Sequence, residues 1–391
     1  MKSRSFNHLA AWACFACLHG TVHAINGAQL GGSGVRNAGM GGASIALPLD
    51  ANAAANNPAG MAYVPSSATL DLQVFDGHSS ADYVLPGNRL ENKQTIAAPQ
   101  GGFNWQLSPQ LAAGVSISGS GSGSDYGRPA LPVSGAGNAK STLRIVELVP
   151  TLAWRPREDL ALGMALTLAY QQFKADGVIV PASVPGGLLP LAGHGMQDST
   201  GVGWRAGVLW KPGNDWSFGA NYKARTIMGR LKGYDTDLLA FSGGHLDIPE
   251  QYGVGVAWQV TPQVVLAADW LRILWGDLKV MQDPNGFRWR NQPVFRFGAS
   301  WAVDDRLTLR AGYSQNRGQI ESSATTQNLL VPSVHEKAYS MGLSWALDAK
   351  NELSIGYEIN PRTTLTGTGA GTGDNLTSRV QMFMLGWQRR F

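Results

Sequence analysis

Residues 339–347 read YSMGLSWAL, and residues 352–360 read ELSIGYEIN. The large apolar side chains of the first stretch stand at every second position: Tyr339, Met341, Leu343, Trp345 and Leu347. The positions between them hold only Ser, Gly or Ala, and the second stretch alternates in the same way. Alternation with a period of two places the two kinds of residue on opposite faces of a β-strand, whereas a helix would mix them around its surface.

The same pattern recurs along most of the chain. The small, polar face is unsuited to a soluble core but suits the lumen of a membrane barrel whose apolar face meets lipid. A soluble sandwich would leave too many Trp, Leu and Ile side chains in water. Tryptophans near predicted strand ends would form the aromatic girdles: Trp204, Trp210, Trp258, Trp301, Trp345 and Trp387. We therefore predict an all-β fold, a transmembrane antiparallel β-barrel.

About fourteen strands are expected, an even number as bacterial barrels require. Their approximate spans are 68–78, 93–106, 110–119, 140–154, 159–174, 197–211, 215–232, 246–259, 263–280, 292–303, 306–316, 336–347, 351–360 and 377–391. Short turns such as Asp304-Asp305 alternate with longer segments rich in Gly, Ser or Pro, such as 120–139 and 317–335. Short periplasmic turns and long external loops are typical of these barrels.

The N-terminus predicts a cleaved secretory signal over residues 1–24. Lys2 and Arg4 precede a short apolar run at 9–18, and 22–24 is an acceptable cleavage site. The only cysteines, Cys14 and Cys17, lie within this signal, so no disulfide is expected in the exported chain. No later stretch is long and apolar enough for a membrane-spanning helix. Export without such a helix indicates the bacterial outer membrane.

Composition fits that location and excludes other classes. Charged residues make up only 15 % of the chain, and its formal net charge is +4, of which the signal supplies two positive charges. This is no electrostatic footprint for nucleic acid. Low charge together with 49 glycines and 13 tryptophans suggests a barrel wall with alternating polar and apolar residues.

The C-terminal residue is aromatic, and apolar side chains recur in steps of two before it. The positions are Phe383, Leu385, Trp387 and Phe391, and Arg389 interrupts the series. The pattern resembles the signal by which the barrel-assembly machinery recognises outer-membrane proteins. We therefore expect that machinery to be a partner of the chain.

Residues 25–66 do not alternate and are not expected to belong to the wall, which should occupy 67–391. The segment is rich in Gly, Ala and Asn, with Arg36 and Asp50 as its only formal charges. Small residues allow tight folding against a crowded surface, so we expect the segment to plug the lumen. Asn57-Pro58-Ala59-Gly60 predicts a turn, because Pro58 fixes its own φ and pushes Asn57 out of the helical region.

This segment resembles the N-terminal hatch of the FadL/TodX transporters of long-chain fatty acids and hydrocarbons. The resemblance rests on the AGMGGA stretch at 38–43, on DANAAAN at 50–56 and on Asn57-Pro58-Ala59-Gly60. The signal, the strand count and the aromatic C-terminus extend it over nearly the whole chain. It implies a fourteen-stranded barrel plugged by the hatch, with lateral release of a hydrophobic substrate near a kinked third strand.

Residue patterns for catalysis or cofactor binding are not found. Four histidines follow the signal, at 78, 194, 245 and 335, without metal-binding spacing. The sequence has no Gly-x-Ser-x-Gly elbow and no nucleophile–base pair. We therefore expect no enzyme activity, no metal and no cofactor.

Alternation also predicts charged side chains within the lumen, at Lys223, Arg225, Arg296, Arg310, Glu352 and Glu358. They could simply be hydrated or paired inside a polar channel. Alternatively, Arg225, Arg296, Arg310 or Lys223 could bind a substrate carboxylate, which pairs well with a guanidinium group.

The leading functional hypothesis is passive uptake of hydrophobic compounds, long-chain fatty acids or aromatic or aliphatic hydrocarbons. Capture in an apolar groove, passage past the hatch and lateral release into outer-membrane lipid or lipopolysaccharide would follow one another. Two alternatives remain at this point: a structural or adhesive barrel with surface-binding loops, and a general polar porin.

Overall fold

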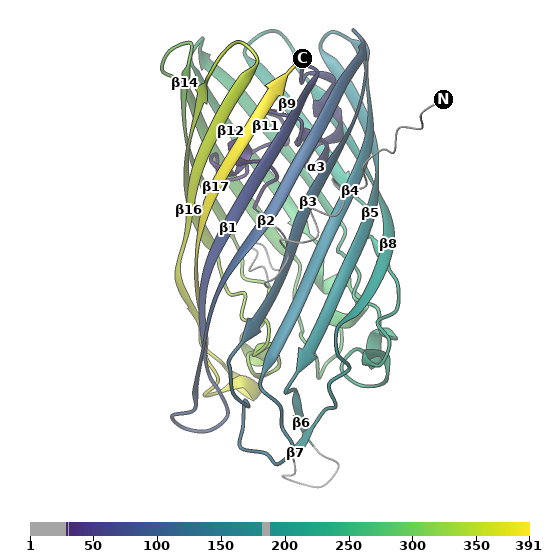
Figure 1. The fold of residues 1–391 in the computed structure, drawn as a ribbon, viewed down its shortest axis with the longest axis vertical. Helices are drawn as coiled ribbons and strands as arrows, with labels where there is room; N and C mark the ends of the chain where they lie inside the picture. Colours follow the sequence, from purple (N-terminus) through teal and green to yellow (C-terminus); the bar gives the residue numbers. More distant parts are fainter. Residues whose placement is uncertain (1–28, 30, 182–187) are drawn as a thin grey trace, which may run out of the picture.

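The computed structural model describes residues 29, 31–181 and 188–391, so the predicted signal at 1–24 lies outside the described residues. Fourteen antiparallel strands close a tall barrel (Figure 1). They are β1 (Ser67–Asp82), β2 (Arg89–Ser108), β3 (Leu111–Asp125), β4 (Lys140–Arg157), β5 (Leu160–Asp176), β8 (Gln197–Trp210), β9 (Trp216–Lys223), β11 (Gln251–Thr261), β12 (Val264–Ile273), β13 (Gln292–Ala302), β14 (Leu307–Asn316), β15 (Lys337–Ala346), β16 (Asn351–Leu365) and β17 (Leu376–Arg390).

The first and last strands pair with each other and close the wall. The β1–β17 register runs from Ser67 opposite Arg390 to Ala81 opposite Leu376. Short turns lie at the end of the barrel that carries the C-terminus, and the long connections lie at the other end (Figure 1). By the rule for such barrels the first end is periplasmic and the second external. The predicted fold class, a transmembrane antiparallel β-barrel, is confirmed. The alternation of apolar and small or polar residues gives each strand one face for lipid and one for the lumen.

Two expected strands end earlier than predicted. The expected strand 215–232 stops as β9 at Lys223, and a short strand β10 (Ile227–Met228) then pairs back to β8. The expected strand 263–280 stops as β12 at Ile273. In both places the apolar residues that follow turn inward and join the packed interior of the loops, as Leu231 and Trp275 do. Their hydrophobicity reflects burial under loops, which alternation alone does not distinguish from contact with lipid.

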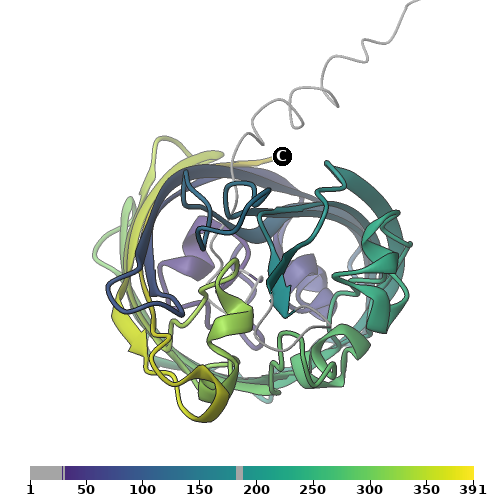
Figure 2. The ribbon, with the colours of Figure 1, turned by 90° about the horizontal axis from the view of Figure 1, so that it is seen from below.

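The external loops fold over the mouth of the barrel (Figure 2). Their buried apolar side chains form a hydrophobic core together with residues of the adjoining wall. The rings of Trp275 and Trp289 meet edge to face with centroids 5.0 Å apart, and Trp289 Nε1 donates to Asn328 Oδ1 at 2.7 Å. The short elements in these loops are β6 (Ile179–Pro181), β7 (Leu188–Pro190), η2 (Tyr234–Thr236), η3 (Ala240–Ser242), η4 (Trp275–Asp277), η5 (Lys279–Met281), η6 (Ser322–Ala324), η7 (Thr326–Asn328) and η8 (Gly369–Gly371). No helix of the described residues is long and apolar enough to cross a membrane.

The described part of the predicted N-terminal segment, residues 29 and 31–66, lies inside the periplasmic half of the lumen as a hatch (Figure 1). Residues 25–28 and 30 of that prediction lie outside the described residues. It contains the short helices α2 (Val35–Ala38), α3 (Ala53–Asn56) and η1 (Pro58–Ala62). Glycines of the wall allow its backbone to approach closely. A Cβ at Gly312 would collide with the backbone of Met40 and Gly41, and one at Gly163 would collide with Pro58 and Ala59.

Polar side chains of the wall satisfy the backbone of the hatch. Asp269 Oδ2 accepts hydrogen bonds from the amides of Ser44 at 2.7 Å and Ile45 at 3.1 Å. Gln100 Oε1 accepts from the Gly34 amide at 3.0 Å, and Ser340 Oγ accepts from the Gly41 amide at 2.8 Å. Because an irregular segment inside a barrel must find partners for its peptide groups, the inward face of the wall is polar.

A candidate substrate cavity between hatch and wall

The Asn-Pro turn joins the hatch to the barrel. Asn57 has φ −149° and ψ 111°, outside the helical region as Pro58 requires. Its Oδ1 accepts from the Ala59 amide at 3.1 Å. Its Nδ2 donates to Ile45 O at 2.7 Å within the hatch and to Val208 O at 3.1 Å in the wall. One amide side chain therefore caps η1 and also connects it to β8.

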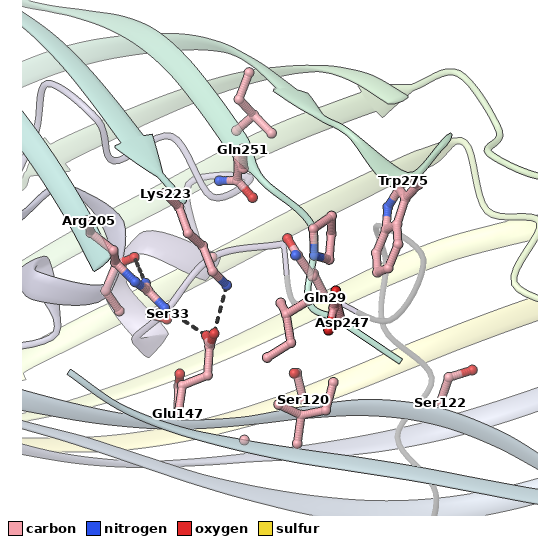
Figure 3. A pocket seen from close by; sticks show the side chains of 18 of the residues that line it. Gln29, Ser33, Ser120, Ser122, Glu147, Arg205, Lys223, Asp247, Gln251 and Trp275 are labelled. Carbon is pink, nitrogen blue, oxygen red and sulfur yellow. Dashed lines mark hydrogen bonds and ion pairs between the residues drawn. The ribbon is translucent and has the colours of Figure 1, made fainter. Parts of the chain in front are cut away.

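A cavity of about 130 Å³ opens beside this turn, between hatch, wall and loops (Figure 3). The hatch contributes Ser33, Ile45 and Pro58, among others. Aromatic side chains on the external side include Phe173, Trp275, Phe287 and Trp289. The cavity therefore has an apolar part on the external side and a polar, partly charged part on the periplasmic side.

A charged group lies in the periplasmic part of the cavity wall. Glu147 of β4 forms ion pairs with Arg205 of β8 at 2.7 Å and with Lys223 of β9 at 2.8 Å (Figure 3). Arg205 also donates to Thr167 Oγ1 at 3.0 Å and to Ala55 O in the hatch at 2.7 Å. One carboxylate thus faces two cations, and Arg205 has two further hydrogen-bond partners, Thr167 in the wall and Ala55 in the hatch.

A larger apolar vestibule of about 710 Å³ lies on the external side of the cavity, among the external loops. Four residues line both spaces: Ser141, Phe173, Phe287 and Val331. Burial, together with the nearby Asp374 carboxylate, raises the pKa of Tyr83, in the vestibule wall, to about 12. That phenol therefore stays neutral at physiological pH.

The cavity also reaches the place where the backbone pairing between β2 and β3 ends. The β2–β3 register begins at Ser108 opposite Leu111 and ends at Gln100 opposite Ser118. β3 continues to Asp125 in full register with β4, and β2 continues to Arg89 in register with β1. Ser118, Gly119 and Ser120 line the cavity at this point.

The structure places the four cations predicted for the lumen in three different surroundings. Lys223 and Arg296 line the cavity, and Arg296 donates to Gly42 O of the hatch at 3.2 Å. Arg310 lies at the wall facing the hatch and donates to Ser344 Oγ at 2.6 Å. Arg225 is not among the cavity residues, because the alternation changes face after Lys223, and its guanidinium donates to Asp277 O at 2.9 Å.

Of the predicted inward acids, Glu358 is buried in the wall and Glu352 forms an ion pair with Arg36 of the hatch.

Glu147 and Arg205 were not singled out from the sequence, although the signal was present. Arg205 follows the exposed Trp204 in β8, and Glu147 precedes the exposed Leu148 in β4. Both occupy inward positions by the same alternation that identified Lys223. Their pairing joins residues 58 positions apart, which no local pattern reveals.

The predicted assembly signal lies on the outer surface of β17 and at its end. Phe383, Leu385 and Phe391 are exposed and Trp387 is half-buried. The Phe391 amide donates to Ser66 O at 3.1 Å, which seals the β1–β17 seam at the periplasmic end. Recognition by the assembly machinery stays a prediction.

Within the described residues, no group of three or more His, Cys, Asp or Glu side chains is arranged to hold a metal ion.

Comparison with known proteins identifies the family. The model of a family described as outer membrane protein transport protein (OMPP1/FadL/TodX) matches residues 16–382. No curated protein matches the sequence significantly.

Several solved structures share the fold. The P. putida toluene transporter TodX has a TM-score of 0.71 at 17 % identity, covering 93 % of this chain and 99 % of its own. A Pseudomonas aeruginosa FadL homologue gives 0.73 at 19 %, covering 93 % and 100 %. The Ralstonia pickettii toluene transporter TbuX gives 0.67 at 16 %, covering 93 % and 99 %. The family match over most of the sequence shows that this chain belongs to the OMPP1/FadL/TodX family of outer-membrane transport proteins.

Proposed function

We propose that the protein takes up small hydrophobic compounds passively across the outer membrane. The observation that supports this most is the series of spaces through the molecule. An apolar vestibule adjoins the cavity between hatch and wall, and that cavity reaches the unpaired part of β2 and β3. A structural or adhesive barrel has no need of such a series, and the packed hatch disfavours a general polar porin.

Capture requires no external energy source in this proposal. A hydrophobic solute gains about 0.8 kcal/mol for each CH₂ group that it buries, so an apolar vestibule concentrates it from dilute solution. Residues such as Leu238, Phe241 and Leu330 provide that surface. The toluene transporters among the structural relatives make hydrocarbons a candidate substrate class, and long-chain fatty acids are the other.

Release is proposed to occur sideways, into the membrane. The hatch fills the lumen on the periplasmic side of the cavity, and its backbone is hydrogen-bonded to the wall around it. A hydrophobic molecule would lose its apolar contacts on that path. The unpaired edges of β2 and β3 offer a shorter route from the cavity to lipid.

A reversible cross-link can test this route. The Cβ of Ala98 on β2 lies 4.0 Å from the position that a Cβ at Gly119 on β3 would occupy. That spacing suits a disulfide, and the only native cysteines lie at 14 and 17. We expect the double variant Ala98→Cys, Gly119→Cys to lose uptake of labelled toluene or oleate when oxidised and to regain it on reduction.

The matched control is a cysteine pair at Ser344 and Ser354, which face each other in the β15–β16 register away from the cavity. It should transport equally well in both redox states. Full uptake by the oxidised Ala98→Cys, Gly119→Cys protein, with the cross-link verified, would contradict lateral release. Absence of uptake by the unmodified protein for every hydrophobic compound tried would contradict the proposed function and favour a structural barrel.

A further inference from the structure

The strands β16, β17, β1 and β2 lie side by side in the wall (Figure 1). The side chains on their outer surface change from apolar to polar at one level. On β1 the outward residues Leu70, Leu72 and Val74 are followed by Asp76 and His78. On β17 the corresponding change lies between Phe383 and Gln381, and on β2 between Ala97 and Thr95. Apolar side chains lie on the periplasmic side of the change and polar or charged ones on the external side.

The position of the change matches the edge of the lipid belt. From Leu107 to Ala97 the outward face of β2 carries only apolar side chains or glycine. At about 3.3 Å per residue this distance is about 33 Å along the strand, or about 25 Å in height for a tilt near 40°. Barrels of this class have an apolar band about 25 Å tall. The next outward residues therefore lie at the level of the headgroups of the outer leaflet.

Cations gather in a groove at this level. His78 stands directly opposite Arg379 of β17 on one side and Lys93 of β2 on the other. Arg362 joins them from β16, where it lies within the irregular stretch of the register between Asn360 and Thr363. These four residues, with Arg89, Glu91 and neighbouring Ser, Thr and Asn side chains, line a groove of about 230 Å³. None of them lines the cavity or the vestibule.

Three of these cations have no counter-charge within the described part of the chain. No described carboxylate lies within ion-pair distance of Lys93, Arg362 or Arg379, and all three are exposed. The nearby acids have other partners. Arg89 pairs with Asp82 at 3.1 Å and Glu91 at 3.4 Å, and Asp76 lies 3.7 Å from His78. The lining residues contain four Arg or Lys and one Glu, a formal charge of +3 with His78 neutral.

We propose that this groove binds the phosphate groups of a phosphorylated glycolipid in the outer leaflet, with the acyl chains of the lipid lying along the apolar faces of β1, β2 and β17. Arginine and lysine form charge-assisted hydrogen bonds to phosphate oxygens. The groove meets two requirements of such a lipid together: unpaired cations at headgroup level, and an apolar surface directly beneath them. The lining residues of the groove are separate from those of the cavity and the vestibule.

Native mass spectrometry of the full-length protein in detergent can test the proposal, with lipid A carrying two phosphates as the probe. We expect the unmodified protein to retain this lipid and to retain dephosphorylated lipid A at least about tenfold less well. The double variant Lys93→Gln, Arg379→Gln should lose the preference. The matched control, Arg272→Gln with Lys337→Gln, removes two exposed cations from β12 and β15 outside the groove and should bind as the unmodified protein does.

Three results would overturn the proposal. The groove variant could bind the phosphorylated lipid as tightly as the control does. The unmodified protein could bind both forms of lipid A equally, which would indicate acyl-chain contact alone. Inorganic phosphate at the same concentration as the lipid could displace it, which would make the groove a site for free phosphate. Uptake of hydrophobic substrate is measured separately, so failure here leaves the proposed function unaffected.

Discussion

Lys223 Nζ lies 2.8 Å from Glu147 Oε1, in the wall of the cavity between hatch and barrel. The other carboxylate oxygen of Glu147 forms an ion pair with Arg205 at 2.7 Å, so this anion lies between two cations from β8 and β9. The group has one positive charge in excess. It joins three strands at the level where β9 ends, and Arg205 extends it into the hatch through Ala55 O. The same residues thus brace the wall and give the cavity its electrostatic sign.

Removing the carboxylate should weaken the barrel. In Glu147→Gln, Arg205 and Lys223 would remain close together without a counter-charge. Breaking a buried ion pair from one side costs about 3–5 kcal/mol. We expect a lower midpoint of urea unfolding in lipid vesicles, with the free energy of unfolding reduced by an amount of that order. Glu91→Gln, which removes an exposed acid from β2, should leave the midpoint unchanged. Equal midpoints for the two variants would contradict a bracing role.

Replacing Asn57 should loosen the hatch without preventing assembly. Asn57→Ala removes the hydrogen bonds to Ile45 O and Val208 O and the cap on Ala59, each worth about 1 kcal/mol. Pro58→Ala should act in the same direction, because it frees the backbone of the turn. We expect faster amide exchange across α3 and η1 and reduced uptake, while the folded barrel still migrates as the unmodified protein does on unheated gels. Asn214→Ala, in an exposed periplasmic turn, is the control. Normal exchange in both hatch variants would show that other contacts fix the hatch.

Alternation predicted the wall well because lipid and lumen impose it on every strand. It failed at the ends of β9 and β12, where residues such as Trp275 are buried by loops and not by lipid. It misplaced Arg225 because the change of face after Lys223 leaves no mark in the residue types. The Glu147–Arg205 pair was missed because strand register, which brings β4, β5 and β8 together, is fixed by long-range pairing. The hatch was predicted because its small residues allow its backbone to lie close to the wall. Gly41 of the hatch, for example, lies directly against Gly312 of β14.

The aromatic C-terminus should matter for assembly more than for stability. Phe391 is exposed and contacts Phe103 with ring centroids 5.9 Å apart. If the barrel-assembly machinery recognises it, Phe391→Ser should reduce the amount of folded protein in the outer membrane several-fold. Tyr339→Ser, which removes another exposed aromatic from β15, should have little effect on that amount. The measurement is the folded fraction in purified outer membranes, compared with refolding of the same variants in vesicles without the machinery. An equal loss for both variants, or a loss that persists in unaided refolding, would assign Phe391 to stability alone.

The cations in the cavity should decide whether the cargo is an acid or a neutral molecule. Lys223 and Arg296 both line the cavity, and Lys223 belongs to the charged group with one positive charge in excess. A carboxylate that enters from the apolar vestibule would meet them at the polar end, where charge-assisted hydrogen bonds are strong. We therefore expect Lys223→Gln and Arg296→Gln to weaken binding of a long-chain acid at least about tenfold, and to change binding of the corresponding alcohol little.

Arg225→Gln and Arg310→Gln remove the same charge from positions outside the cavity lining, so neither should alter the ratio of the two affinities. The ratio also separates a head-group contact from damage to the hatch. Loss of the Arg296 bond to Gly42 O would affect acid and alcohol alike, whereas loss of a carboxylate contact affects the acid alone. Equal binding of acid and alcohol by the unmodified protein would reduce all four cations to structural roles in the wall. Neutral hydrocarbons would then be the favoured cargo, since a cavity with its excess charge screened by water gains nothing from a carboxylate.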